Sequence, residues 1–405
     1  MADTYLNPGG WLGAWLDFAG ANKEVPREYT LALGVGLLGA FLAGGERYTI
    51  ATGVSPIALT PRVSSILVGE SSSGKGLAFQ WGMELLDKVN DVMPDDRLLE
   101  SLSDASTPEF LVNSLATNSW KLFIADEAVI ALGCQREYNR NFAENLTSLL
   151  DEKQRFAFNF LKRQDLIRRP LLTFLAGSNE VWLGRLLSPE LAIGGFPGRF
   201  MWWFAPPPTE IEDELPTRSE KEWEEIVAFF KSRAQLQAAL SVAKGCAITP
   251  AVERYRAWRR EHITQERERK RTYGEDDRLG SWRDRWPMWL LRLAMVSAAS
   301  HGRVQLHLDD IEWGLSALET NAGPYATALG QLEMVGRPDR RDAIKRAIVA
   351  IGGVVKATQL LQSKAVRVHF RSAEALTLEL NEMVAAGEVR RTVAPNKDFN
   401  YILVG

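Results

Sequence analysis

The sequence has few of the residues that build metal sites and disulfide frameworks. Among its 405 residues are 2 cysteines, Cys134 and Cys246, and 4 histidines. The cysteines are too few and too far apart for a disulfide framework or a zinc site, and the histidines show no metal-ligand spacing. These shortages argue against disulfide-rich and zinc proteins. With no signal-peptide pattern at the start, they predict a reduced, cytoplasmic chain.

Long hydrophobic runs are also missing. The most apolar stretch, Tyr29–Ala43, has 15 residues, whereas a membrane-spanning helix needs roughly 20. We therefore expect a buried helix there and no membrane partner.

No charge of one sign dominates, because 48 Lys and Arg against 51 Asp and Glu give a net charge of −3. The distribution is uneven, however. Residues 337–405 have 12 Lys and Arg against 7 Asp and Glu, which is +5, and the remainder is 36 against 44, or −8. This asymmetry is typical of a basic terminal module on an acidic body.

A glycine-rich loop with the spacing G-x-x-x-x-G-K directly follows the apolar run 63–68. Glycines in such a loop turn successive backbone N–H groups into one concavity that binds phosphate, and the lysine adds a charge for the outer phosphates. The pattern predicts ATP binding by six residues, which are Gly69, Ser72, Ser73, Gly74, Lys75 and Gly76.

A second motif supports the first. An apolar segment, 121–125, ends in the two carboxylates Asp126 and Glu127. In P-loop ATPases the first acid holds the Mg²⁺ shell and the second polarises the attacking water. We therefore expect ATP and Mg²⁺ as cofactors, with Asp126 at the metal and Glu127 as a catalytic residue.

The loop departs from the usual pattern at Gly76, where a Ser or Thr normally reaches Mg²⁺ with its hydroxyl. The metal would then be held by phosphates, waters and Asp126, with help from Ser72 or Ser73. This predicts a slow ATPase, and a loop that binds ATP without hydrolysing it is the alternative.

Short apolar segments alternate with helical stretches between 56 and 205, which is typical of a parallel α/β sheet. The four expected strands are 63–68, 121–125, 171–176 and 200–204. We predict an AAA+-like P-loop core at 56–205. The other expected regions are an N-terminal helical prefix at 1–55, a helical lid at 206–336 and a winged-helix domain at 337–405, with junctions at the proline-rich 205–216 and at Arg337-Pro338.

Polar and basic residues near the expected strands are further catalytic candidates. Asn179 follows the strand 171–176, where AAA+-type ATPases place a residue that orients the attacking water, although a helix N-cap at Ser178 or Asn179 is compatible with the same pattern. Arg199 lies in a glycine-rich loop, 194–200, at a position that resembles the arginine finger of ring ATPases such as the minichromosome-maintenance helicases. A structural arginine paired with a carboxylate is the rival interpretation.

One arginine, Arg292, stands in a mostly apolar helix. Because an unpaired arginine costs too much inside a core, we expect it to turn toward the nucleotide as a lid residue, with Arg285 as the alternative.

Two regions are candidates for DNA contact. Residues 155–169 predict a β-hairpin with Lys162 and Arg163 near its apex, which would either grip single-stranded DNA in a ring channel or stand as a solvated surface hairpin. In 337–405, helices followed by the strands 389–393 and 401–404 predict a winged helix. The helix before the wing would contact duplex DNA, with Arg367 and Arg371 near its start. The alternative is a winged helix that serves as a protein–protein module.

Together these motifs resemble a family of P-loop proteins borne by phages, plasmids and satellites, known as a domain of unknown function and often found beside virus-type primases. The resemblance covers roughly residues 10–300. It depends on the helical prefix, the P-loop and four further segments, 104–111, 125–127, 175–179 and 195–200.

The resemblance implies an ATP-dependent DNA helicase or translocase of mobile-element replication, which assembles as a homo-oligomeric, hexameric ring and works beside a primase. A replication initiator or helicase-loading switch, which binds ATP and DNA without processive motion, is the alternative. A degenerate ATP-binding scaffold is the third.

Overall fold

The chain is represented by a computed structural model, which falls into two compact units, Met1–Leu329 and Gly330–Gly405. Each unit is treated by itself. The residues described are 4–20, 22–44, 48–51, 56–94, 98–102, 108–128, 142–151, 155–159, 164–179, 195–208, 218–240, 249–273, 278–303, 305–367, 370, 373–393 and 399–404.

The larger unit is built on a five-stranded sheet in which every strand is parallel to its neighbours. In the order in which they pair, the strands are β4 (Glu100–Leu102), β5 (Trp120–Ala125), β8 (Leu171–Ser178), β3 (Ser65–Val68) and β9 (Met201–Phe204). The prediction of an α/β protein with a parallel sheet is therefore confirmed, including all four expected strands. The edge strand β4 was not predicted, because three residues with two exposed side chains leave no apolar run in the sequence.

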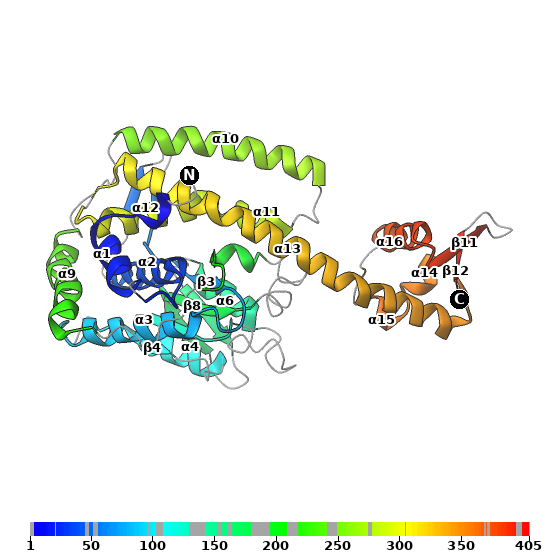
Figure 1. The fold of residues 1–405 in the computed structure, drawn as a ribbon, viewed down its shortest axis with the longest axis horizontal. Helices are drawn as coiled ribbons and strands as arrows, with labels where there is room; N and C mark the ends of the chain where they lie inside the picture. Colours follow the sequence, from blue (N-terminus) through cyan, green and yellow to red (C-terminus); the bar gives the residue numbers. More distant parts are fainter. Residues whose placement is uncertain are drawn as a thin grey trace. The chain divides into compact units, whose positions relative to one another are not determined.

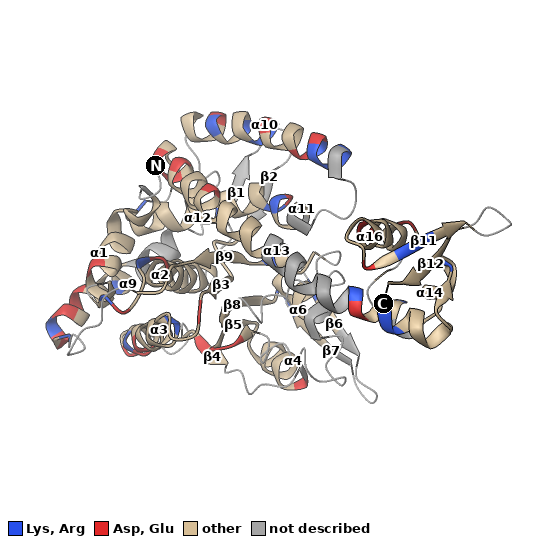
Figure 2. Ribbon diagram, turned by 45° about the vertical axis from the view of Figure 1, so that its right-hand side comes forward, with Lys and Arg blue, Asp and Glu red and all other residues tan. Residues whose placement is uncertain are grey.

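Helices cover the sheet on both sides. α2 (Arg27–Ala43) crosses one face and contacts β3, β5, β8 and β9. Its side chains from Tyr29 to Ala43 are all buried, which confirms the predicted buried helix. Figure 2 shows α2 and α3 (Lys75–Asn90) on one side of the sheet, with α4 (Pro108–Thr117) and α6 (Phe142–Leu150) on the other. No helix in the described part of the chain could span a membrane.

Further helices surround this core (Figure 1), and several of them lie in 206–336, where a helical region was expected. They are α1 (Gly10–Ala19), α9 (Glu220–Leu240), α10 (Thr249–Tyr273), α11 (Arg278–Arg283), α12 (Trp286–Ser300) and α13 (Leu308–Ile351), with the short helices η1 (Thr4–Leu6) and η4 (Pro197–Arg199). α13 runs without interruption through Arg337-Pro338, where the sequence suggested a break. An interior proline costs a helix about 3 kcal/mol through a lost hydrogen bond and a ring clash, so the 44-residue α13 carries this cost at Pro338.

Two short hairpins complete the larger unit. β1 (Tyr48–Ala51) pairs with β2 (Pro56–Leu59), so the expectation that residues 1–55 are helical was wrong at its end. β6 (Arg155–Asn159) pairs with β7 (Gln164–Arg168) in antiparallel register, which confirms the hairpin. Its apex, with Lys162 and Arg163, lies outside the described residues.

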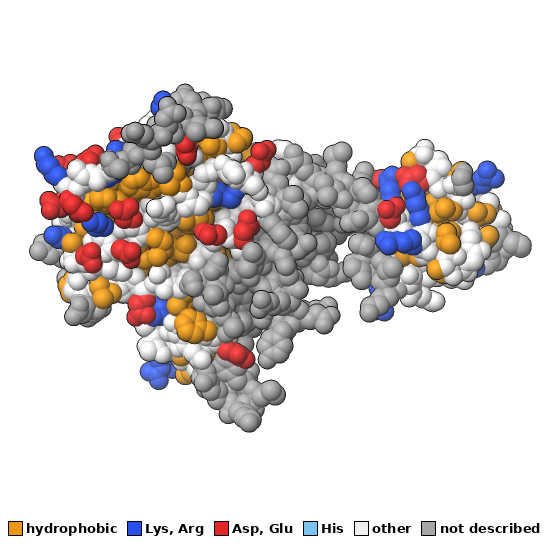
Figure 3. All heavy atoms as spheres, turned by 60° about the horizontal axis from the view of Figure 1, so that its bottom comes forward, with side chains coloured by type: hydrophobic (Ala, Val, Ile, Leu, Met, Phe, Trp, Pro, Cys, Tyr) orange, Lys and Arg blue, Asp and Glu red, His pale blue; other side chains and the backbone are white. Residues whose placement is uncertain are grey.

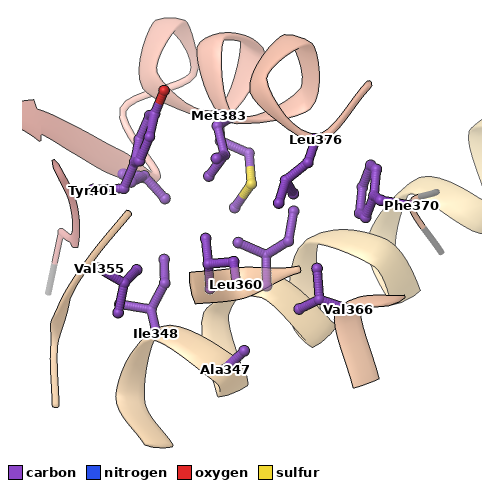
Figure 4. Close-up of a cluster of buried hydrophobic side chains, with 12 residues drawn as sticks. Ala347, Ile348, Val355, Leu360, Val366, Phe370, Leu376, Met383 and Tyr401 are labelled. Carbon is purple, nitrogen blue, oxygen red and sulfur yellow. The ribbon is translucent and has the colours of Figure 1, made fainter. Parts of the chain in front are cut away.

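The smaller unit combines the end of α13 with short helices and a three-stranded antiparallel sheet in the order β10-β12-β11. Its other elements are β10 (Val354–Val355), α14 (Ala357–Leu360), α15 (Lys364–Arg367), α16 (Ala373–Ala385), β11 (Val389–Val393) and β12 (Phe399–Leu403). In Figure 4, Ile348 on α13 and Met383 on α16 point into one apolar core. The predicted order of helices followed by a two-stranded hairpin is confirmed. Arg367, however, lies at the end of α15 and not on α16.

Candidate functional site

Three strands of the parallel sheet end side by side at one edge, and each carries a predicted site residue there. The loop that begins at Gly69 follows β3, and its amide donates a hydrogen bond of 3.2 Å to the carbonyl oxygen of Ser178 at the end of β8. Gly177 allows the end of β5 to approach, since a Cβ at Gly177 would lie 2.3 Å from the carbonyl oxygen of Asp126. Because parallel strands share their carboxyl edge, the loop, Asn179 and the two acids lie together.

The loop has the backbone conformation that its glycines permit. Gly74 has φ +81°, and Ser72 has φ +67°, a rare value for a residue with a side chain. A Cβ at Gly74 would lie only 2.1 Å from the carbonyl oxygen of Glu24, so no other residue fits there without moving the neighbouring segment. α3 begins at Lys75, directly after Gly74. Turned amides followed by a helix N-terminus are what a phosphate group requires.

Lys75 is folded back onto its own loop. Its ammonium group donates to the carbonyl oxygens of Gly69 at 2.8 Å and Glu70 at 2.7 Å, and to the hydroxyl of Ser73 at 3.1 Å. Burial lowers the pKa of Lys75, and the nearby Glu127 opposes this change. Phosphate oxygens in the loop would replace these acceptors with charged ones, and charged acceptors bind an ammonium group more strongly.

Glu127 is held in an environment that suits a general base. Burial raises the pKa of its carboxyl group, while Lys75 lowers it and Asp126 raises it. Its Oε2 is buried and has no hydrogen-bond partner among the described residues. A buried acceptor of this kind usually binds a water or a ligand group, so Glu127 fits the expected role of polarising a water.

Few side chains at the site could bind a metal ion. Asp126 is exposed at the end of β5, and the described residues contain no group of three His, Cys, Asp or Glu side chains that could hold a metal. The hydroxyl of Ser73 is buried and bound by Lys75, whereas Ser72 is exposed. Mg²⁺ commonly uses one or two protein carboxylates plus phosphates and waters. The residues present fit a metal held in that way, with Asp126 as its protein partner.

Tyr29 supports the loop and was missed by the sequence reasoning. Its hydroxyl donates to the carbonyl oxygen of Val68 at 2.8 Å and lies 3.4 Å from the hydroxyl of Ser73. Burial raises the pKa of Tyr29 to about 12. A Cβ at Gly69 would lie 2.0 Å from the hydroxyl of Tyr29, so Gly69 is required for this contact as well as for the loop. Tyr29 gave no sequence signal, because it is the first residue of a run that only predicts a buried helix.

Arg199 lies at the opposite edge of the sheet from the P-loop of its own chain. β3 and β9 are parallel and in register from Ser65 opposite Met201 to Val68 opposite Phe204. Arg199 precedes β9, whereas the P-loop follows β3. A four-residue strand separates the two edges by about 13 Å. This placement at the opposite edge of the sheet argues against a finger that acts within one subunit.

Arg199 belongs instead to a cluster of charged residues centred on Asp151. One guanidinium nitrogen lies 3.1 Å from Asp151 and another donates to the carbonyl oxygen of Gly195 at 2.5 Å. Arg285 also contacts Asp151, at 3.3 Å. Burial lowers the pKa of Arg285, and the charges of Arg199 and Arg292 add to this effect. The alternative interpretation of Arg199, a structural arginine paired with a carboxylate, thus agrees with a contact that is present. The carboxylate, Asp151, was not predicted.

Arg292 is almost completely buried, 4% exposed, and its guanidinium lies over the ring of Trp289 at 5.1 Å. Trp289 donates to the carbonyl oxygen of Gly198, next to Arg199. The described contacts of Arg292 therefore link it to the Asp151 cluster, together with its alternative, Arg285.

Of the predicted DNA-binding residues, Arg367 is exposed, and Lys162, Arg163 and Arg371 lie outside the described residues. α16, the helix expected to contact DNA, has three glutamates and no Lys or Arg. No protein-family model matches this chain, and the comparison with curated proteins yields no match.

Proposed function

We propose that the protein is an ATP-dependent DNA helicase or translocase, an AAA+-like P-loop ATPase of phage or satellite replication that hydrolyses ATP between the subunits of a ring. The observation that carries this proposal is the meeting of the turned loop, Lys75 and the partnerless Oε2 of Glu127 at one edge of a parallel sheet. That arrangement combines a phosphate cradle with a base for water, which are two of the elements that attack on an outer phosphate requires.

In the proposed reaction Lys75 and the loop amides bind the phosphates, and Asp126 would hold a Mg²⁺ ion, which would neutralise part of the phosphate charge. Glu127 accepts a hydrogen bond from the attacking water, which Asn179 orients from the neighbouring strand. Arg199, on the far edge of the sheet, acts on the nucleotide of the adjacent subunit. In support, Arg199 lies at the edge of the sheet opposite the P-loop of its own chain.

The DNA-binding part of the proposal has two components. The hairpin β6–β7, with Lys162 and Arg163 at its apex, would contact single-stranded DNA in the ring channel. The smaller unit would act as a winged helix on duplex DNA. Because α16 carries only negative charges, this contact would use Arg367, Arg371 and the exposed Arg390 and Arg391 of β11.

A replication initiator or helicase-loading switch is the second candidate, and Gly76 favours it. Without a hydroxyl at that position Mg²⁺ loses one of its usual ligands, so nucleotide exchange rather than rapid turnover would drive the protein. In that case the smaller unit could serve as an assembly module. Figure 3 shows hydrophobic side chains beside Lys and Arg on the visible face of this unit, to the right.

The deciding experiment measures ATP turnover with and without single-stranded DNA, and images the particles with ATP to count subunits. Strong stimulation by DNA together with ring particles supports the helicase or translocase. Slow turnover that DNA leaves unchanged, with tight ATP binding, supports the switch. Absence of ATP binding contradicts both. Glu127→Gln is the matched control, because it should bind ATP and give no turnover under either condition.

A further inference from the structure

Helix α10 is a strongly basic element on a unit whose overall charge is negative. Its 25 residues include 8 Lys and Arg and 4 glutamates. Lys and Arg recur along α10 in Figure 2. The proposed ATP chemistry makes no use of this helix.

The basic residues of α10 gather on one side. At 3.6 residues per turn, six of them fall within about 120° of arc, and we call them the α10 stripe. They are Arg256, Arg259, Arg260, Arg267, Lys270 and Arg271. The glutamates between Arg256 and Arg271 fall outside this arc, and Glu253 lies at its edge. Arg260, Arg267, Lys270 and Arg271 are exposed and the other two are half-buried.

The two arginines of α10 that lie outside the stripe each form an ion pair with a glutamate. Arg254 contacts Glu312 at 2.5 Å and Arg269 contacts Glu266 at 2.8 Å, and neither arginine belongs to the stripe. Within the stripe, Lys270 contacts Asp284 at 2.6 Å. Among the residues that the structure describes, none of the five stripe arginines forms an ion pair. Their charges are thus available to an outside partner.

The side of α10 opposite the stripe is fixed to the larger unit. Trp258 stacks on His262 with ring centroids 4.9 Å apart, and His262 stacks on Trp286 of α12 at 5.6 Å. Burial lowers the pKa of His262, which keeps this contact apolar. Because the apolar side is already covered, α10 has no hydrophobic face to insert into a membrane surface. The side of α10 that faces away from these contacts carries the basic side chains of the stripe.

We propose that the α10 stripe binds the phosphate backbone of nucleic acid. From Arg256 to Arg271 the stripe is about 22 Å long at 1.5 Å per residue. A duplex of that length presents about 13 phosphate charges, at one per 1.7 Å of axis. The stripe has cations and lacks the aromatic side chains that stack on bases, so the contact is to the backbone and independent of sequence.

The test uses the full chain without ATP, so that failure of this site and failure of ATP hydrolysis are separate results. The variant Arg260→Glu/Arg267→Glu reverses two exposed stripe charges. Lys221→Glu/Lys231→Glu, at two exposed positions of α9, is the control with the same change in net charge. Binding of labelled single-stranded and duplex DNA is followed by fluorescence anisotropy between 50 and 200 mM salt.

We expect the stripe variant to bind at least about tenfold more weakly at 100 mM salt, because two phosphate contacts are lost. The slope of log affinity against log salt should fall by about 1.8 for duplex or about 1.4 for single strands. The control should match the unsubstituted protein. The form of DNA that shows the loss is the form that the stripe binds.

Three results would overturn the proposal. The first is equal weakening of DNA binding in both variants, which would indicate a general charge effect. The second is an unchanged slope of log affinity against log salt in the stripe variant. The third is no DNA binding by the unsubstituted chain at 50 mM salt. Arg260→Gln/Arg267→Gln provides the same comparison with a smaller perturbation if the charge-reversed protein does not fold.

Discussion

The two units of this protein bury their side chains in different ways. All 13 tryptophans lie in Met1–Leu329, and the smaller unit has none. The smaller unit instead exposes seven of the ten large hydrophobic side chains that are exposed in the described part of the chain. They are Val349, Ile351, Val354, Leu378, Val393, Phe399 and Val404. The larger unit thus covers its large apolar side chains more completely than the smaller unit, which buries a core of 12 residues and leaves others exposed.

The two units also differ in how far their Lys and Arg side chains are paired with carboxylates. In the smaller unit Arg341 contacts three glutamates, including Glu379 at 2.7 Å and Glu388 at 2.6 Å, and Lys345 contacts Glu388 at 2.8 Å. Part of its net charge of +4, from 12 Lys and Arg against 8 Asp and Glu in 330–405, is therefore neutralised internally. The larger unit is acidic overall, yet it concentrates unpaired arginines on α10. Net charge alone does not locate a phosphate-binding face.

The largest expected effect concerns the interior of the larger unit. Lys75→Ala should remove ATP binding, whereas Glu127→Gln should keep binding and lose turnover by about a hundredfold or more, because one residue serves phosphate and the other water. Nucleotide binding and ATPase assays separate the two. Hydrogen exchange in 376–383 of the smaller unit should be unchanged in both variants. Equal loss of ATP binding in both would contradict the division of roles.

The next effect concerns the Asp151 cluster. Arg199→Ala should lower turnover about a thousandfold if Arg199 acts across a subunit interface. Mixing these subunits with Lys75→Ala subunits should restore part of the activity. Asp151→Asn should lower turnover less and leave ATP binding intact, because it frees Arg199 without removing it. No recovery at any mixing ratio, with assembly confirmed by particle images, would favour a purely structural Arg199.

As the pH falls, the larger unit should be affected before the smaller unit. The pKa of Glu127 is raised by burial, so ATPase activity should fall as pH drops, while the pH is still above 4.5, the ordinary value for glutamate. The pKa of Glu388 is lowered, first by its hydrogen bond to Lys345. A lowered carboxyl pKa contributes stability above the unfolded value, and this stability is lost as pH falls through the folded value.

The smaller unit should therefore lose protection from hydrogen exchange only below pH 4.5. Lys345→Met should weaken that pH dependence and leave the ATPase profile unchanged. Loss of protection in the smaller unit before loss of activity would reverse the expected order.

The smallest effect concerns the missing hydroxyl of the loop. A Cβ at Gly76 would meet no atom within 4 Å, so Gly76→Ser should fold normally and raise turnover several-fold by adding a ligand for Mg²⁺. Gly74→Ser is the matched control. With φ +81° and a Cβ 2.1 Å from the carbonyl oxygen of Glu24, it should disrupt the loop and abolish ATP binding. An unchanged rate in Gly76→Ser would show that Mg²⁺ needs no ligand there.

Local patterns in the sequence determined much of the larger unit. The P-loop follows from glycine spacing, since only glycine tolerates the φ of Gly74 and the close approach at Gly69. The strands were predictable because short segments rich in apolar residues, such as Leu122–Ala125 and Met201–Phe204, indicate buried parallel strands. β4 escaped notice because it has neither feature. In the smaller unit, the segments 389–393 and 401–404 correctly indicated the two strands that pair as β11 and β12.

Long-range contacts were decided only by the tertiary structure. Asp151 is 48 residues from Arg199 and 134 from Arg285, and Tyr29 is 39 from Val68. Nothing in the local sequence distinguishes that aspartate from any other, or a stripe arginine of α10 from Arg254, which is held by Glu312. Backbone conformation and apolar periodicity act between near neighbours, so the sequence encodes them directly. The partner of a charge depends on which distant segments the fold brings together, and that is fixed only when the whole core has packed.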